Sequence, residues 1–214
     1  MTDLIVKQTR SLNGTVKAPP SKSLTHRAII AASLSEGLST LRNVLFCDDT
    51  IATIKACTML GAEIVQRGHN TLIINGRSDP LTPTDVINCQ NSASTMRFLA
   101  PVCALAEGIS VLTGGQSLRQ RPMEPLLTAL THLGVSCYSA KRDGYPPLII
   151  FGGGISGGKA SLRGDVSSQF ISGLLFASPR AKNDTEISIL SPLESKPYVQ
   201  MTIDILRKHQ LVID

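Results

Sequence analysis

The stretch APPSKSLTHRAIIAAS, residues 18–33, indicates how the rest of this 214-residue chain is organised. Lys22 and Arg27 stand among hydroxyl residues and lead straight into an apolar block. An unbroken apolar block predicts a helix that is buried on every side. Helix starts carry unpaired N–H groups and partial positive charge, so cations placed beside them indicate a pocket for an anion. The ordinary alternative is that Ser21 and Ser23 only cap the helix.

The composition favours a folded globular protein whose ligand is a small anion. Hydrophobic residues make up 42% of the chain, and the formal net charge is +5. The positive charges are scattered and aromatic residues account for only 4%, which disfavours nucleic-acid binding by base stacking. We therefore expect no nucleic-acid partner.

Cysteine usage and the absence of long apolar runs indicate a cytoplasmic protein without membrane contact. The five cysteines are an odd number and include no C-x-x-C pair, which favours reduced thiols. The first residues lack the apolar region of a signal peptide, and no apolar run is long enough to span a membrane. The four histidines lie far apart in sequence, so no metal site is expected. His26 is expected at the surface or as a helix cap.

The chain contains an internal repeat. Three segments begin with small polar residues and then turn apolar, at 21–34, 91–106 and 167–178. Each is followed by a more amphipathic segment, at 48–65, 123–138 and 197–214. Short stretches rich in Val, Ile, Leu and Thr fill the gaps and predict strands. The sequence thus predicts one α/β domain of three βαβαββ units with pseudo-threefold symmetry.

Three local features qualify this prediction. The third unit ends at LVID, 211–214, which indicates a truncated last unit. Pro101 lies inside the second apolar segment and is expected to kink that helix or end it early. The run GGGISGGKAS, 152–161, nearly matches a phosphate-binding loop, but Ala160 stands where a hydroxyl is needed and no helix is expected to follow. We expect a glycine-rich hairpin there.

If the three buried helices direct their starts at one face, their polar residues meet in a shared cleft. These residues are Ser21, Lys22, Ser23, Arg27, Asn91, Ser92, Ser94, Arg97, Ser167, Ser168 and Gln169. Each charge-assisted hydrogen bond contributes about 1.5–3 kcal/mol, so three or four of them suffice for a small dianion. The adjacent run 48–50, Asp-Asp-Thr, is expected only to cap the next helix.

Several motifs resemble those of the 5-enolpyruvylshikimate-3-phosphate synthase family. They occur in the order of the N-terminal half of that family and cover nearly the whole chain: PPSKSLTHRAIIAASLSEGLSTLRNVLFCDDT, NSASTMRFLAP, QSLRQRPMEPLLTALTHLGV, YPPL, GDVSSQF and SKPYVQMT. The UDP-N-acetylglucosamine enolpyruvyl transferases share the family's fold but lack the pairing of SSQ with SKPY. They are a distant second interpretation.

The resemblance implies an inside-out barrel of two similar domains, each built from three repeated units. Residues 1–12 would then belong with the second domain, which is absent from this chain, and the chain would cross over near Gly14. Residues 13–214 would form the N-terminal domain that binds shikimate 3-phosphate. The implied partner is a complementary C-terminal domain.

The implied reaction transfers the enolpyruvyl group of phosphoenolpyruvate to the 5-hydroxyl of shikimate 3-phosphate and releases phosphate. It belongs to chorismate and aromatic amino acid biosynthesis and needs no metal or organic cofactor. By resemblance Lys22 is catalytic and touches both substrates. The shikimate 3-phosphate ligands would be Lys22, Ser23, Arg27, Ser167, Ser168, Gln169, Ser195 and Tyr198. The phosphoenolpyruvate ligands would be Lys22, Ala93, Arg121 and Gln169. Arg97 would support the loop at 90–95.

The chain departs from the family pattern in three ways. Gln90 replaces a glycine, which is expected to strain the turn. Ala93 adds a methyl group where the family usually has glycine, which implies weakened binding of the herbicide glyphosate. The missing second domain supplies catalytic carboxylates in the family, so the chain alone is expected to be inactive. The alternative is a stand-alone domain that binds a phosphorylated small acid.

Overall fold

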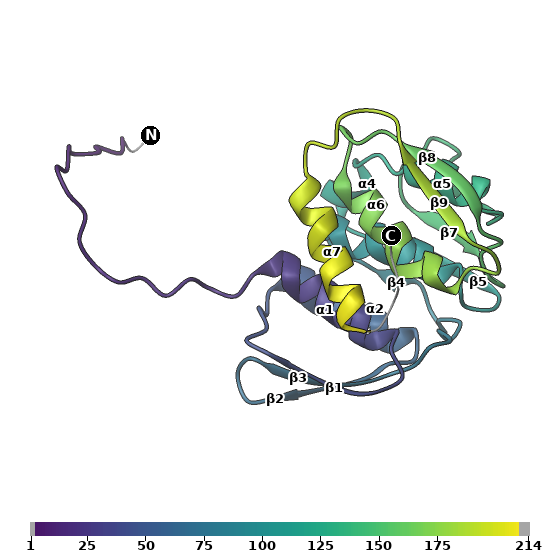
Figure 1. Ribbon diagram of the computed structural model, residues 1–214, viewed down its shortest axis with the longest axis horizontal. Helices are drawn as coiled ribbons and strands as arrows, with labels where there is room; N and C mark the ends of the chain where they lie inside the picture. The colour runs from purple at the N-terminus through teal and green to yellow at the C-terminus, as the bar shows by residue number, and fades with distance from the viewer. Residues whose placement is uncertain (1–2, 210–214) are drawn as a thin grey trace.

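The computed structural model of the protein describes residues 3–209 (Figure 1). Residues 3–20 form an exposed arm without helix or strand, and the arm extends away from the body of the molecule. The first group of elements comprises α1 (Lys22–Ser33), β1 (Gly37–Arg42), α2 (Asp48–Met59), β2 (Glu63–Arg67) and β3 (Thr71–Gly76). The expected leading strand of the first unit is therefore not found in the arm.

The second and third groups follow the predicted order more closely. The second comprises β4 (Ile87–Asn88), α3 (Ala93–Cys103), β5 (Ile109–Thr113), α4 (Gln116–Arg119), α5 (Glu124–His132), β6 (Cys137–Ser139) and β7 (Leu148–Phe151). The third comprises β8 (Gly158–Leu162), α6 (Ser168–Ala177), a 3-10 turn (Ser178–Arg180), β9 (Thr185–Ile189) and α7 (Lys196–Lys208). The short helix α4 was not predicted. The expected last hairpin would involve residues 210–214, which lie outside the described residues.

The strands form three small sheets. The first has the order β1-β3-β2 and is antiparallel, with Leu41 opposite Leu72. The second has the order β4-β5-β7-β6, in which only β4 and β5 are parallel. The third pairs β8 with β9 in parallel. The glycine-rich run at 152–157 joins β7 of the second sheet to β8 of the third, so the expected hairpin at this place is wrong.

The helices divide into buried and amphipathic ones, as the sequence predicts. In α1 the side chains of Ile29, Ile30 and Ala32 are fully buried, and α3 and α6 are likewise buried along most of their length. The last helix, α7, buries only Val199, Thr202 and Leu206. Positions three and four apart share one face of a helix, so α7 covers the core with a single stripe and leaves its other side in solvent. Figure 1 shows α7 lying across the body beside α1 and α6.

A close backbone contact joins α3 to α6. Pro101 has no N–H, so the carbonyl of Arg97 lacks its usual helical partner. The oxygen of Arg97 instead faces Gly173 of α6, where any Cβ would overlap it. The helix α3 continues past Pro101 and ends at Cys103. It is therefore two residues longer than a helix that stops at the proline.

We predict that Gly173→Ala lowers the free energy of unfolding by about 1–3 kcal/mol, because the added Cβ overpacks the α3–α6 contact. In an uncrowded helix the same substitution stabilises by up to about 1 kcal/mol, so the sign of the change is diagnostic. Urea denaturation followed by circular dichroism measures the effect. A more stable variant would show that the two backbones are not in close contact.

Candidate anion-binding site

The start of α1 carries a cation held by a carboxylate from α2. Ser21 caps the helix by accepting a hydrogen bond from the Leu24 amide at 3.3 Å. Lys22 Nζ lies 2.7 Å from Asp49 Oδ2, with the two side chains 51% and 28% exposed. This hydrogen bond raises the pKa of Lys22, so the amine is charged at neutral pH. Asp49 thus does more than cap α2, whose capping hydroxyl comes from Thr50.

Arg27 is a buried cation that pairs with no carboxylate among the described residues. Its Nε donates to Thr202 Oγ1 at 2.7 Å, one terminal nitrogen donates to Ser172 Oγ at 3.3 Å, and the other donates to the Ser23 carbonyl at 3.0 Å. The guanidinium also lies 4.9 Å from the centre of the Phe98 ring. Burial lowers the pKa of Arg27 to about 10, so the group stays charged. Neutral groups alone therefore solvate this charge.

Arg97 links the starts of α3 and α6. One terminal nitrogen donates to Gln169 Oε1 at 2.9 Å and to Ser167 Oγ at 3.3 Å. The other lies 3.5 Å from the Pro122 carbonyl, and the guanidinium stacks 4.7 Å from the centre of the Phe170 ring. Its pKa is lowered to about 10, chiefly by burial. Arg97 thus holds the α6 start, and its expected role of supporting the loop at 90–95 stays a prediction.

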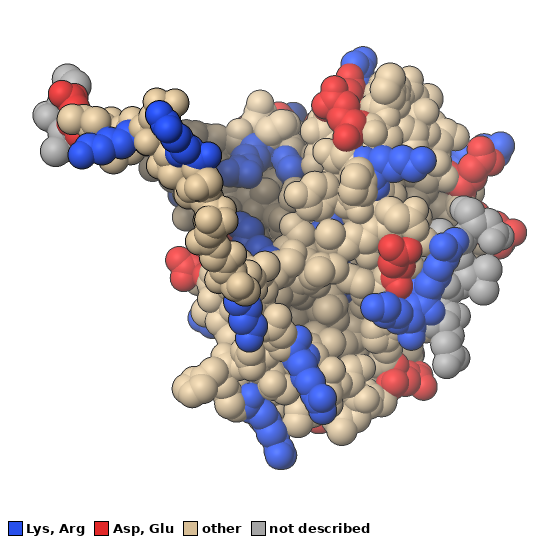
Figure 2. Space-filling view, turned by 60° about the vertical axis from the view of Figure 1, so that its left-hand side comes forward, with Lys and Arg blue, Asp and Glu red and all other residues tan. Residues whose placement is uncertain are grey.

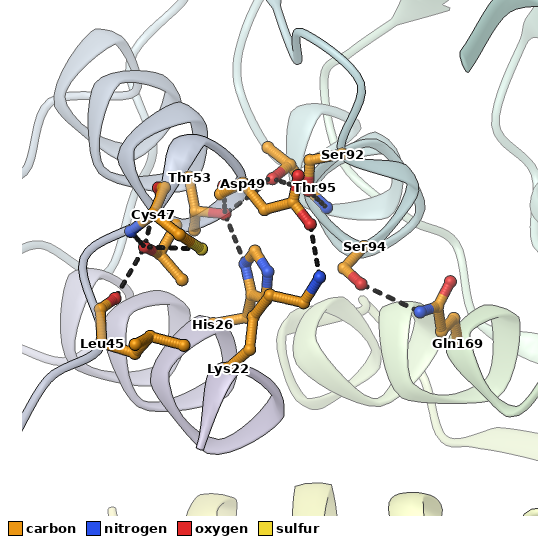
Figure 3. Close-up of polar contacts among 11 residues, drawn as sticks. Lys22, His26, Leu45, Cys47, Asp49, Thr53, Ser92, Ser94, Thr95 and Gln169 are labelled. Atoms are coloured by element: carbon orange, nitrogen blue, oxygen red, sulfur yellow. Dashed lines mark hydrogen bonds and ion pairs between the residues drawn. The ribbon is translucent and has the colours of Figure 1, made fainter. Parts of the chain in front are cut away.

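Further contacts join the helix starts directly. Gln169 Nε2 donates to Ser94 Oγ at 2.9 Å, and the close-up in Figure 3 shows these two side chains meeting between α6 and α3. Ser167 caps α6 by accepting from the Gln169 amide at 3.2 Å. Ser92 caps α3 by accepting a hydrogen bond from the Thr95 amide, and Ser168, which follows Ser167, is buried. The expected meeting of the α3 and α6 starts is therefore confirmed by geometry.

The remaining expected ligands surround these contacts. Arg121 is exposed, and its charge disfavours the charged forms of both Lys22 and Arg97, so the three cations lie within electrostatic reach of one another. Tyr198 is 45% exposed, with its ring centre 5.8 Å from the Arg27 guanidinium. Ser195 occupies the N-cap position of α7, and its side chain makes no capping hydrogen bond.

The turn before α3 shows the two sequence departures. Gln90 adopts a φ of 52°, in the left-handed region that glycine tolerates best, so the expected strain at this position is confirmed. The Gln90 carbonyl accepts a hydrogen bond from the Gly115 amide, and its own amide donates to Asn88 Oδ1 at 2.8 Å. Ala93 is the first residue of α3 and is only 6% exposed.

A buried polar chain beneath the Lys22–Asp49 pair was not predicted. His26 is 1% exposed, so the expectation of a surface or capping role is wrong. Its Nδ1 lies 2.7 Å from Thr53 Oγ1, and Thr53 in turn contacts Thr95 of α3 at 2.7 Å. Burial lowers the pKa of His26 to about 4. The sequence did contain a sign of this polar chain, namely threonines on otherwise apolar faces of helices. A buried threonine hydroxyl needs a hydrogen-bond partner.

Other features of the surface define what the site is not. Figure 2 shows a recess beside the N-terminal arm, with Lys and Arg atoms within it. Another hollow of the surface is lined by a different set of residues, among them Arg119, Lys141 and Tyr145. Within residues 3–209 no group of three or more His, Cys, Asp or Glu residues is arranged to hold a metal ion. None of the helices in this range has the length and apolarity to cross a membrane.

Fold and site together define an α/β domain in which cations and hydroxyls lie at the starts of buried helices. The chain matches the family model described as EPSP synthase (3-phosphoshikimate 1-carboxyvinyltransferase) over residues 6–214. The chain therefore belongs to the EPSP synthase family, and the resemblance inferred from its motifs is confirmed.

Individual relatives agree with this assignment. The chain is 46% identical to the 3-phosphoshikimate 1-carboxyvinyltransferase of Methanocaldococcus jannaschii, covering 99% of this chain and 49% of that protein. It is 45% identical to the corresponding protein of Methanothermobacter thermautotrophicus, covering 99% and 50%. A solved EPSP synthase from Acinetobacter baumannii matches with a TM-score of 0.78 at 28% identity, over 87% of this chain and 42% of that one. The chain spans about half the length of the relatives that it matches.

We predict that His26 makes stability depend on pH. The unfolded ring takes up a proton as the pH falls through 6.5, whereas the folded ring stays neutral down to about 4. Proton uptake thus favours unfolding in this window, so stability is fully present above pH 6.5 and falls by about 3 kcal/mol towards pH 4. Denaturation curves of the native protein and His26→Asn, compared at each pH, isolate this contribution from that of the carboxylates. Parallel curves for the two proteins would contradict it.

Proposed function

We propose that this chain is the shikimate 3-phosphate-binding part of an enolpyruvyl transferase. Joined to a complementary C-terminal half, it would move the enolpyruvyl group of phosphoenolpyruvate to the 5-hydroxyl of shikimate 3-phosphate. The proposal is supported by family membership and by relatives named 3-phosphoshikimate 1-carboxyvinyltransferase. The chain covers only half of those relatives, so the complete activity requires the remaining half.

The observation that carries this proposal is a buried cation that has no carboxylate partner within residues 3–209. Arg27 is 2% exposed and is solvated by two hydroxyls, a carbonyl and an aromatic face. A buried charge is costly unless an opposite charge compensates it. Arg97 and Lys22 add positive charge nearby, and Asp49 offsets only one of these cations. A dianionic ligand with a carboxylate and a phosphate would supply the missing negative charge.

We assign the residues as follows. Lys22 touches both substrates and takes part in catalysis, Ser23 and Arg27 bind the shikimate carboxylate, and Gln169 lies close to both substrates. The 3-phosphate is bound by Ser167, Ser168, Ser195 and Tyr198. Phosphoenolpyruvate is bound by Lys22 and Arg121, with Ala93 against it. Support comes from the contacts that join the starts of α3 and α6, and from the position of Tyr198 beside Arg27.

The three-unit organisation belongs to the same proposal. Residues 13–214 would form one domain of three repeated units with pseudo-threefold symmetry, the last unit being incomplete. Parallel strand pairs on either side of α3 and of α6 support it, as do the recurring antiparallel triplets β1-β3-β2 and β5-β7-β6. Residues 1–12 would pack on the C-terminal half. The apolar side chains of Leu4 and Leu12 support this, since they are 89% and 91% exposed here.

We predict that the purified chain binds shikimate 3-phosphate and that Lys22→Met weakens binding about tenfold or more, since one charge-assisted bond is worth about 1.5–3 kcal/mol. The control is Lys196→Met, an exposed cation at the start of α7 to which we assign no ligand contact. Isothermal titration calorimetry measures both. Equal losses in the two variants would argue for nonspecific attraction.

The same preparation separates the proposal from a stand-alone binding domain. We expect no phosphate release by the chain alone and restored turnover when a C-terminal half is added. Binding without any restored turnover would favour the stand-alone domain, and turnover by the chain alone would overturn the assignment of catalytic groups to the other half.

We predict that Ala93→Gly strengthens glyphosate binding to the reconstituted enzyme. Ala93 is 6% exposed at the start of α3, so its methyl group occupies space that a ligand longer than phosphoenolpyruvate would need. Inhibition constants for glyphosate, with the Michaelis constant for phosphoenolpyruvate as the control, measure the effect. The same micromolar inhibition constant in both proteins would contradict it.

A further inference from the structure

Beneath the Lys22–Asp49 pair, a chain of hydrogen bonds runs through three helices (Figure 3). It starts at His26 Nδ1 in α1 and passes to Thr53 Oγ1 in α2 at 2.7 Å. It continues to Thr95 Oγ1 in α3 at 2.7 Å and ends at the capping hydroxyl of Ser92, also at 2.7 Å. His26, Thr53, Thr95 and Ser92 are each no more than 1% exposed.

The direction of this chain follows from its unpaired end. His26 Nε2 is buried and has no hydrogen-bond partner within the described residues. If the proton were on Nε2, a buried N–H donor would be left unpaired, and such orphaned donors are rare. With the proton on Nδ1, His26 donates to Thr53, Thr53 to Thr95, and Thr95 to Ser92, so each threonine hydroxyl accepts once and passes its one hydrogen along the chain. Burial keeps the pKa of the ring near 4, so only a neutral tautomer is present at neutral pH.

The chain also fixes the segment that holds the catalytic lysine. The carbonyl of Asp49 lies 3.3 Å from Thr53 Oγ1 and 3.2 Å from Thr95 Oγ1, so each threonine can share its one hydrogen between the next hydroxyl of the chain and the backbone of Asp49. The side chain of Asp49 in turn holds Lys22. At its other end the chain reaches Ser92, two residues before Ser94, which accepts from Gln169.

We propose that His26 is a positioning residue: by donating from Nδ1 it orients the Thr53–Thr95–Ser92 chain and so sets Asp49, Lys22 and the α3 start for ligand binding. The inference rests on the proposed function for its ligand, shikimate 3-phosphate. A purely space-filling role is the competing explanation, because the ring also packs edge-on to Phe98 with 6.5 Å between ring centres. The two roles differ in whether the proton on Nδ1 matters.

The first test locates that proton without any ligand. Long-range ¹H–¹⁵N NMR spectra of the ¹⁵N-labelled chain at neutral pH distinguish a protonated nitrogen from a bare one. We expect Nδ1 protonated and Nε2 bare. A proton on Nε2 would overturn the proposal, because the ring would then accept from Thr53 instead of orienting it.

The second test uses three variants of His26, which place a hydrogen-bond donor at the Nδ1 position, at the Nε2 position, or at neither. The amide of His26→Asn can reach the Nδ1 position, that of His26→Gln reaches the Nε2 position, and His26→Phe keeps the packing with no donor. We expect shikimate 3-phosphate affinity within about threefold of native for Asn and about tenfold weaker for Gln and Phe, one hydrogen bond's worth. Native-like affinity in the Gln and Phe variants, with unchanged circular dichroism, would overturn the proposal. Equal losses in all three would do the same.

A third measurement separates this inference from the proposed function. Backbone amide shifts of Asp49 and Ser94 are compared between the variants in the absence of ligand. We expect them to move in His26→Gln and to stay near their native values in His26→Asn. If the native chain binds no shikimate 3-phosphate, the proposed function fails, while the proton position and these shifts still decide the role of His26. Unmoved shifts in His26→Gln would count against it.

Discussion

The charge of Arg27 is buried in the amino-terminal half of α1, and four helices supply the groups that solvate it. A cation near a helix start opposes the macrodipole, and burial removes the water that would otherwise solvate it. Here α6 and α7 supply hydroxyls, α3 supplies the face of Phe98, and α1 supplies a backbone carbonyl. Four helices from separate parts of the chain therefore have to be in place before this one side chain is stable.

The same constraint accounts for the kind of groups near the site. Hydroxyls and aromatic faces solvate a guanidinium without neutralising it, so its field remains available to a ligand. A carboxylate in their place would cancel that field. In the part of the chain that the structure describes, the carboxylate bound to a site cation is Asp49. It pairs with Lys22, whose side chain is half exposed and can exchange partners at modest cost. In the proposed function, attraction for an anion and adjustable geometry beside the reacting atoms would thus be provided by different residues.

Much of this could be predicted from sequence, and the failures have a common cause. The burial of α1, α3 and α6 follows from apolar blocks with no polar face, and the cations at their starts are visible by inspection. The position of His26 is not, because its partner Thr53 is 27 residues away and that of Arg27, Thr202, is 175 residues away. A polar residue between Thr25 and Arg27 looks like part of a solvated turn until the packing of α2 against α1 is known. Local patterns therefore predicted most of the helices and strands, while the polar contacts between elements required the tertiary structure.

The contact between Gly173 and Arg97 has a consequence for how the domain can change over evolutionary time. One residue, Arg97, fixes the spacing of α3 and α6 through its backbone oxygen and also holds Ser167 and Gln169 through its side chain. Substitutions at 97, 101 or 173 would alter the α3–α6 spacing together with the side-chain contacts of the α6 start, so we expect these positions to be inherited as a set. Any effort to retune ligand preference at the α6 start will have to leave that trio intact.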